Sequence, residues 1–184
     1  MTILNDVRRA MVDARGPWYA KDHDGCGFYA IYIKSNCNLP AIEVPEDGLL
    51  YIGMTRRGFS QRDHFNPRSG HSGSCTFRRS LGVLLKEQLS LEARPRSRQS
   101  AGYHFRFDIR GEQALSEWMK GSLYLARVPF GENVELAERQ LIRAFEPPLN
   151  LRGWANPQSY LIERLRAKSA SEARAFAKRT QEAA

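Results

Sequence analysis

The chain has 184 residues, of which 42% are hydrophobic, and it carries 28 lysines and arginines against 20 aspartates and glutamates. This length and apolar content suit one globular domain over residues 1–184, and the net charge of +8 favours a polyanionic partner such as RNA, DNA or a membrane surface. No apolar run approaches the ~18 residues of a membrane-spanning helix, and the first residues lack the apolar stretch of a signal peptide. We therefore expect a soluble, cytoplasmic protein that does not enter a membrane.

The first part of the chain predicts a helix followed by two core strands. Apolar residues at intervals of three and four over residues 2–15 predict an amphipathic N-terminal helix that ends near Gly16 and Pro17. Residues 27–33, GFYAIYI, are apolar or aromatic on both alternating faces, so we expect a strand buried on both sides. A second strand, LLYIG at residues 49–53, follows a polar connection that contains prolines, and the pair predicts a hairpin with a long loop.

The rest of the chain is mainly helical, with one further core strand. We expect helices over residues 59–65, 74–89, 112–119, 133–145 and about 157–180, strands over residues 103–109 and 122–128, and a basic loop over residues 90–102. The last helix, rich in arginine and alanine, is expected to be solvated. The sequence thus predicts an α/β fold, with a small, mainly antiparallel sheet of three core strands flanked by helices and with helical additions at both ends.

The three cysteines, Cys26, Cys37 and Cys75, are odd in number and form no CxxC pair. Neither a disulfide framework nor a zinc site can be read from this spacing. We expect free thiols.

The helix predicted over residues 133–145 has one charged residue within its apolar stripe. At about 100° per residue, one apolar arc contains Glu138, and the arc is formed by Val134, Ala137, Leu141, Ile142 and Phe145. A carboxylate that faces a core is costly unless it is paired or binds a cation. Glu138 is therefore either an acid at the lip of the stripe, paired with an arginine, or a metal ligand.

Two tyrosines stand in the predicted core strands, Tyr29 in GFY and Tyr51 in YIG. Either tyrosine alone is typical of a core position. Four segments in order, GFYAIYI, LLYIGMT, FSQR and AERQLIRAFEPPLN, nevertheless resemble the GIY-YIG nuclease superfamily. The segment HSGSCTFRRSLGVLL is similar to its stand-alone bacterial members. This resemblance implies a core over about residues 24–152.

The resemblance implies a Mg²⁺- or Mn²⁺-dependent endonuclease that hydrolyses DNA phosphodiester bonds. Such a reaction needs an activated water and stabilisation of the charge that develops on phosphorus and on the leaving oxygen. By resemblance, Glu138 binds the ion and Arg62 holds the scissile phosphate. Tyr29 orients or deprotonates the water, and Tyr51 supports it. His64 is the alternative base, because imidazole titrates near pH ~6.5, or else an ordinary surface histidine.

Several basic residues are candidates for contacts with nucleic acid. Arg56, Arg57, Arg78 and Arg79 either neutralise phosphates or are solvated charges, and the same two readings hold for the arginines of the loop at residues 94–98. Asn150 either contacts the substrate backbone or caps the turn after the two prolines that precede it. DNA is the expected partner, with RNA left open.

Two other readings predict different behaviour. A catalytically inactive nucleic-acid-binding protein would retain the fold without cleaving. A purely structural reading makes the tyrosines core residues and pairs Glu138 with a basic side chain far from them. One small domain carries one active site, so a double-strand cut requires a homodimer or two visits to the substrate.

Overall fold

A four-stranded antiparallel sheet is the centre of the fold. The computed structural model describes residues 2–18, 25–56, 58–59, 71–97, 105–130 and 133–182, with side chains from residue 5 onward. The strand order is β1-β6-β2-β3, with β1 at Arg15–Pro17, β2 at Gly27–Ile33, β3 at Leu49–Thr55 and β6 at Leu123–Pro129. The expected antiparallel core of three strands is confirmed, and the short strand β1 extends it by one strand at the edge.

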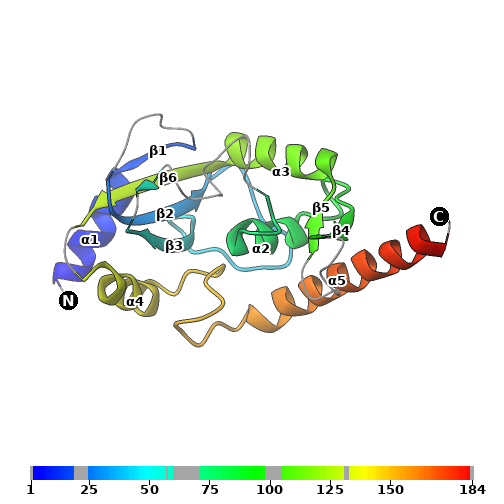
Figure 1. Cartoon of the computed structure of the whole chain (residues 1–184). Coiled ribbons are helices and arrows are strands. Elements are labelled where there is room, and N and C mark those ends of the chain that lie inside the picture. Colours follow the sequence, from blue (N-terminus) through cyan, green and yellow to red (C-terminus); the bar gives the residue numbers. More distant parts are fainter. Residues whose placement is uncertain are drawn as a thin grey trace.

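Helices cover both faces of this sheet, and a second sheet lies beside it. The helices are α1 at Thr2–Asp13, α2 at Thr76–Leu84, α3 at Ile109–Ser122, α4 at Val134–Phe145 and α5 at Ser159–Glu182. The second sheet pairs β4 (Ala93–Pro95) with β5 (Phe105–Phe107). Figure 1 shows α1 and α4 near the N-terminal end of the molecule and α5 running away from the sheet toward the C-terminus.

Strand β2 is buried along its whole length, as its unbroken apolar pattern predicts. It lies between β6 and β3, so that Tyr29 pairs with Arg127 on one side and with Gly53 on the other. The pairing with β3 shifts by one residue between Ile31 and Tyr32, which marks a β-bulge. Strand β3 is an edge of the sheet.

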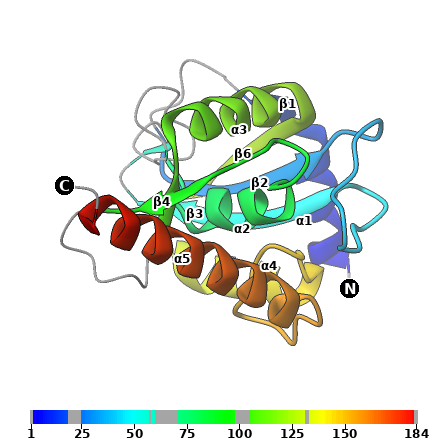
Figure 2. The same cartoon turned by 90° about the vertical axis from the view of Figure 1, so that its right-hand side faces the viewer.

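The two faces of β2 contribute to two hydrophobic clusters. Tyr29, Ile31 and Ile33 lie in one cluster with residues of α2 and α3, whereas Phe28, Ala30 and Tyr32 lie in the other with residues of α1 and α4. Figure 2 shows the sheet between these two sets of helices. The strand is buried on both sides because a helical layer covers each face.

Several elements differ from the sequence-based expectation, and the differences lie where tertiary contacts decide. The N-terminal helix ends at Asp13, because residues 15–17 pair with β6 rather than continuing the helix. Helix α2 is shorter than expected and begins after Cys75, whose sulfur accepts a hydrogen bond from the backbone N–H of Arg78. Residues 93–95 of the expected basic loop form β4 through pairing with β5. The helix expected over residues 59–65 lies outside the described residues except for Phe59.

The expectation that the last helix is solvated is confirmed only for its last part, residues 174–182, which bury no side chain. Helix α5 packs against α2 and β4 and buries Ile162, Ser169, Ala170 and Ala173. Three of these four side chains are small, so the helix can approach its neighbours closely, and small residues give little apolar signal in a sequence.

Two expectations of composition agree with the structure. Cys26, Cys37 and Cys75 are all free cysteines. None of the described helices is long and apolar enough to cross a membrane.

Candidate active site

Tyr29 and Tyr51 come together on the face of the sheet that α2 and α3 cover. Their ring centroids lie 6.2 Å apart with an interplanar angle of 30°. Tyr29 is 2% exposed, and Phe59 meets its ring edge-on at 6.5 Å. Tyr51 is half-buried and packs against Phe77 of α2 at 5.3 Å. The two tyrosines therefore share one aromatic cluster although they belong to different strands.

Gly53 allows the Tyr29 ring to lie across strand β3. A Cβ atom at position 53 would stand 2.4 Å from the Tyr29 hydroxyl oxygen and 2.5 Å from the ring carbon that bears it. Such a separation is far inside van der Waals contact, so a larger residue would displace the ring or the strand. The glycine of the YIG segment thus directs the Tyr29 hydroxyl over the edge strand of the sheet.

Helix α4, which carries Glu138, packs against the same edge strand from the other side of the sheet. Helix α4 buries Val134, Leu141, Ile142 and Phe145 and packs against β3 and β2. Glu138 is half-buried on the side of the helix that carries these apolar residues. The tyrosine rings lie on the opposite face, so β3 is the element that the tyrosine pair and the glutamate helix share.

Asn150 fastens the edge strand. Its side-chain Oδ1 accepts a hydrogen bond from the backbone N–H of Ile52 at 2.8 Å, and its Nδ2 donates to the carbonyl of the same residue at 2.8 Å. The side chain is 7% exposed. Asn150 therefore satisfies two backbone groups that an edge strand would leave unpaired. This role is neither the expected substrate contact nor the expected cap of the turn.

Arg56 and the first turn of α4 line a small pocket. The pocket has a volume of about 340 Å³, and its lining includes Cys26, Phe130, Leu136 and Arg139 in addition to Arg56 and Glu135. The Arg56 guanidinium forms an ion pair with Glu135 at 2.7 Å, and both side chains are exposed. An exposed ion pair of this kind is weak and is readily exchanged for a phosphate.

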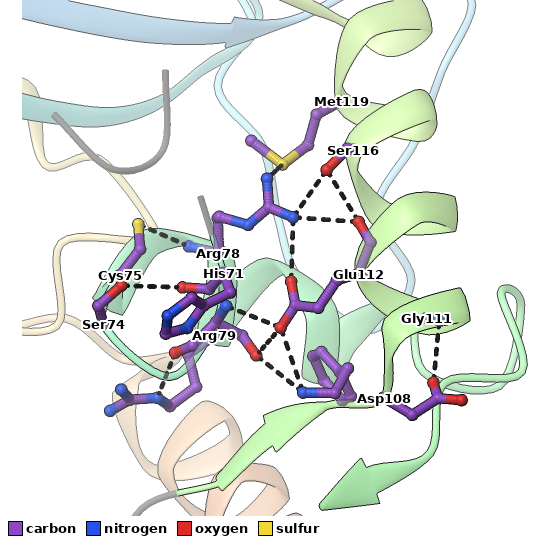
Figure 3. A network of polar contacts seen from close by, with 12 residues as sticks. His71, Ser74, Cys75, Arg78, Arg79, Asp108, Gly111, Glu112, Ser116 and Met119 are labelled. Atoms are coloured by element: carbon purple, nitrogen blue, oxygen red, sulfur yellow. Dashed lines mark hydrogen bonds and ion pairs between the residues drawn. The ribbon is translucent and has the colours of Figure 1, made fainter. Parts of the chain in front are cut away.

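Arg78 has a structural role rather than the expected contact with nucleic acid. Its side chain is 2% exposed and points from α2 toward α3 (Figure 3). There its Nη2 donates to a Glu112 carboxylate oxygen at 3.0 Å and to the Ser116 hydroxyl at 2.9 Å. The other Glu112 oxygen accepts from the backbone N–H of Ser72 at 2.8 Å. Reaching a phosphate would break this buried network.

The buried pair carries a sequence signal of the same kind as Glu138. On helices with about 100° per residue, Arg78 stands at the border of the apolar arc of α2, next to Leu85, and Glu112 stands at the border of the apolar arc of α3, next to Met119. Two opposite charges at the borders of two apolar arcs are able to pair with each other when the helices pack. The sequence-based interpretation missed Glu112.

Arg79 points away from that network. Its Nε donates to the Ser72 carbonyl at 2.9 Å and its Nη2 to the Gly73 carbonyl at 2.7 Å. Burial, and then the charge of Arg96, lower the pKa of Arg79 below its ordinary value. The remaining predicted residues, Arg57, Arg62 and His64, lie outside the described residues.

The donor set suits a divalent ion that is held mainly by water and substrate. In the ranges that the structure describes, no three histidine, cysteine, aspartate or glutamate side chains gather as metal ligands. Mg²⁺ keeps several waters and commonly uses one or two carboxylates together with substrate phosphate oxygens. A single half-buried carboxylate such as Glu138 fits that requirement.

The fold is a mixed α/β domain, and the comparison with known families shows that the domain is of nuclease type. The profile of the GIY-YIG catalytic domain matches residues 27–169, and the chain belongs to this family. The resemblance seen in the sequence is thereby confirmed. No curated protein and no solved structure gives a significant match.

Proposed function

We propose that this protein is a metal-dependent DNA endonuclease whose active site lies along strand β3. The observation that carries the proposal is the Tyr29 ring lying over Gly53 beside Tyr51, within a GIY-YIG catalytic domain. A packing role alone does not require a tyrosine hydroxyl to pass over a glycine of an edge strand. The position of α4 against the same strand supports Glu138 as the carboxylate of this site.

Each residue has a defined task in the proposed reaction. Glu138 holds Mg²⁺ or Mn²⁺, which when bound supplies Lewis-acid stabilisation of the phosphate charge. Arg62 holds the scissile phosphate by charge-assisted hydrogen bonds. Tyr29 orients the attacking water or takes its proton, and Tyr51 fixes the Tyr29 ring by packing against it. His64 is the alternative proton acceptor.

The substrate is a polynucleotide held by its phosphates. Arg56, Arg57 and Arg79 are the proposed phosphate contacts, and they give salt-dependent binding with little dependence on sequence. Arg56 is exposed, and its ion pair with Glu135 leaves it accessible to solvent. DNA is the proposed substrate, and a double-strand cut requires two copies of the chain or two successive events. That the chain is a single domain stays a prediction. Its location in the cytoplasm also stays a prediction.

Incubation with several nucleic acids tests the proposal. The full chain is mixed with supercoiled, linear and branched DNA and with single-stranded RNA, with Mg²⁺, with Mn²⁺ and with a chelator, and the products are separated by electrophoresis. The proposal predicts metal-dependent cleavage of DNA that Tyr29→Phe and Arg62→Ala each reduce. DNA binding without cleavage under any metal condition would instead identify an inactive binding protein. Cleavage confined to RNA would overturn the choice of DNA.

A further inference from the structure

Three arginines gather around the segment that leads into helix α2. Arg79 bonds the carbonyls of Ser72 and Gly73, as described above. Arg166 of α5 donates from its Nη2 to the carbonyl of Thr76 at 2.8 Å. The Arg96 side chain passes the same segment, since its Cγ lies 3.3 Å from where a Cβ of Gly73 would stand. These residues, Arg79, Arg96 and Arg166, are called the arginine cluster below.

The arginine cluster places like charges next to one another within the described residues. Burial, and then the charge of Arg79, lower the pKa of Arg166 to about 10, while Glu163 acts in the opposite direction. Arg96 lowers the pKa of Arg79 in the same way. The carboxylate of Glu112, which lies on the other side of Ser72, is already bound to Arg78. The guanidiniums therefore repel one another, and a bound anion would relieve this repulsion.

Polar atoms without partners lie beside the cluster. Among the described residues, the Nε of Arg166 and the Nδ1 of His71 are buried and make no hydrogen bond. His71 flanks the same segment, because its Nδ1 lies 2.9 Å from the Cβ position of Gly73. Figure 3 shows the imidazole next to Arg79, on the side facing away from Glu112. Buried polar atoms without partners are costly, so a ligand that adds oxygen acceptors here would stabilise the segment.

The cluster lies next to the tyrosine pair. Thr76, whose carbonyl binds Arg166, directly precedes Phe77, and the Phe77 ring packs on Tyr51 at 5.3 Å. The Tyr51 phenol also acts electrostatically on Arg166. The arginine cluster and the tyrosines are thus on the same face of the sheet, and an extended ligand can touch both.

We infer that the arginine cluster binds a phosphate of the substrate strand next to the scissile one, so that the strand runs from the tyrosine pair across the start of α2 toward α5. This inference rests on the proposed function and adds the path of the substrate. Guanidinium groups suit the task because they present several donors in a fixed plane to phosphate oxygens. Arg166, on a helix outside the expected core, becomes a substrate-binding residue.

Equilibrium binding of a single-stranded oligodeoxynucleotide tests this inference without relying on cleavage. The affinity of the full chain is measured without divalent metal at several salt concentrations, for the wild type and for Arg79→Gln, Arg96→Gln and Arg166→Gln. Arg9→Gln is the control, because Arg9 is an exposed arginine of α1, which packs on the other face of the sheet. Thermal unfolding of each variant shows whether it is folded. Arg166→Lys keeps the charge if Arg166→Gln fails to fold.

We expect each cluster variant to bind several-fold more weakly and to lower the slope of log affinity against log salt by about one, whereas Arg9→Gln leaves both unchanged. Inorganic phosphate should compete with the oligonucleotide for the wild type but less for the cluster variants. Folded cluster variants with wild-type affinity and slope would overturn the inference. If these variants lose binding while the wild type cleaves no substrate with any metal, the cluster is a phosphate site of a nucleic-acid-binding protein and the proposed endonuclease activity fails.

Discussion

The side chain at position 53 decides where the Tyr29 ring can lie. Replacing Gly53 with alanine puts a Cβ 2.4 Å from the Tyr29 hydroxyl oxygen. We expect Gly53→Ala to lower the free energy of unfolding by about 1–3 kcal/mol, as overpacking of a core does, and to reduce cleavage strongly because the hydroxyl moves. Urea denaturation and the initial rate of plasmid nicking measure the two effects.

A second glycine provides the control for this substitution. A Cβ at Gly121 of α3 would meet nothing within 4 Å. Gly121→Ala should therefore keep full activity and be at least as stable as the wild type, because alanine is the better helix former. A Gly53→Ala variant that behaves like Gly121→Ala would show that Tyr29 does not depend on the glycine.

Tyr32 shows the cost of a buried hydroxyl. The residue is 0% exposed, and in the described part of the chain its hydroxyl has no hydrogen-bond partner. Burial, and then the charge of Asp47, raise its pKa well above the ordinary value of ~10. The folded state therefore keeps a proton that the unfolded state loses above pH ~10, so the contribution of this group to stability is present below that pH and is lost as the pH rises toward its folded pKa.

The variant Tyr32→Phe should remove both effects. We expect it to be about 1 kcal/mol more stable at pH 7, because an unpaired buried hydroxyl disappears. It should also lose less stability than the wild type between pH 9 and about 11. Urea denaturation across this range measures both, with Tyr160→Phe as the control because Tyr160 is 73% exposed. A less stable Tyr32→Phe would mean that the hydroxyl has a favourable partner.

At the scale of the element, the segment after α4 holds strand β3 in place. Asn150 bonds both backbone groups of Ile52, and the backbone N–H of Leu149 donates to the Leu50 carbonyl at 2.9 Å. The segment is itself fixed, because the Trp154 Nε1 donates to the carbonyls of Pro147 and Asn150. The strand that carries Tyr51 and Gly53 is thus fastened at its free edge.

Truncation of Asn150 separates its structural role from substrate binding. Asn150→Ala leaves the N–H and the carbonyl of Ile52 without partners, so we expect a loss of about 2–4 kcal/mol in the free energy of unfolding. Asn38→Ala, at an exposed asparagine, should cost little. Denaturant unfolding and oligonucleotide binding are compared for both variants. An Asn150→Ala protein as stable as the wild type but with weaker binding would assign Asn150 to the substrate instead.

Elements with a strong local pattern could be predicted, whereas short strands could not. Strand β2 matches its expected residues 27–33 because seven consecutive apolar or aromatic residues leave little choice. Strands β1 and β4 have three residues each and form only through pairing with β6 and β5, which lie far along the chain or across a loop. No local signal identifies such a strand.

At the scale of the whole molecule, the sequence predicted that the two tyrosines of the candidate site lie on neighbouring strands. It did not predict which charged side chains form ion pairs between different elements. The tyrosines follow from two adjacent strands. Arg78 and Arg79 are neighbours in the sequence, yet Arg78 is buried against Glu112 and Arg79 binds the carbonyls of Ser72 and Gly73. The contacts that each arginine makes depend on α3 and on the segment that leads into α2. The sequence of α2 alone gives no information about these two parts of the chain.

In the proposed active site, Glu138 from one face of the sheet and the tyrosine pair from the other act together at one metal-dependent site along β3. The most direct measurement is the initial rate of supercoiled plasmid nicking at saturating Mg²⁺ for the wild type, for Glu138→Gln and for Glu117→Gln, whose exposed carboxylate on α3 makes a matched control. We expect a rate at least about 100-fold lower for Glu138→Gln, with unchanged oligonucleotide binding, and a wild-type rate for Glu117→Gln. A wild-type rate for a folded Glu138→Gln protein would contradict the proposed site.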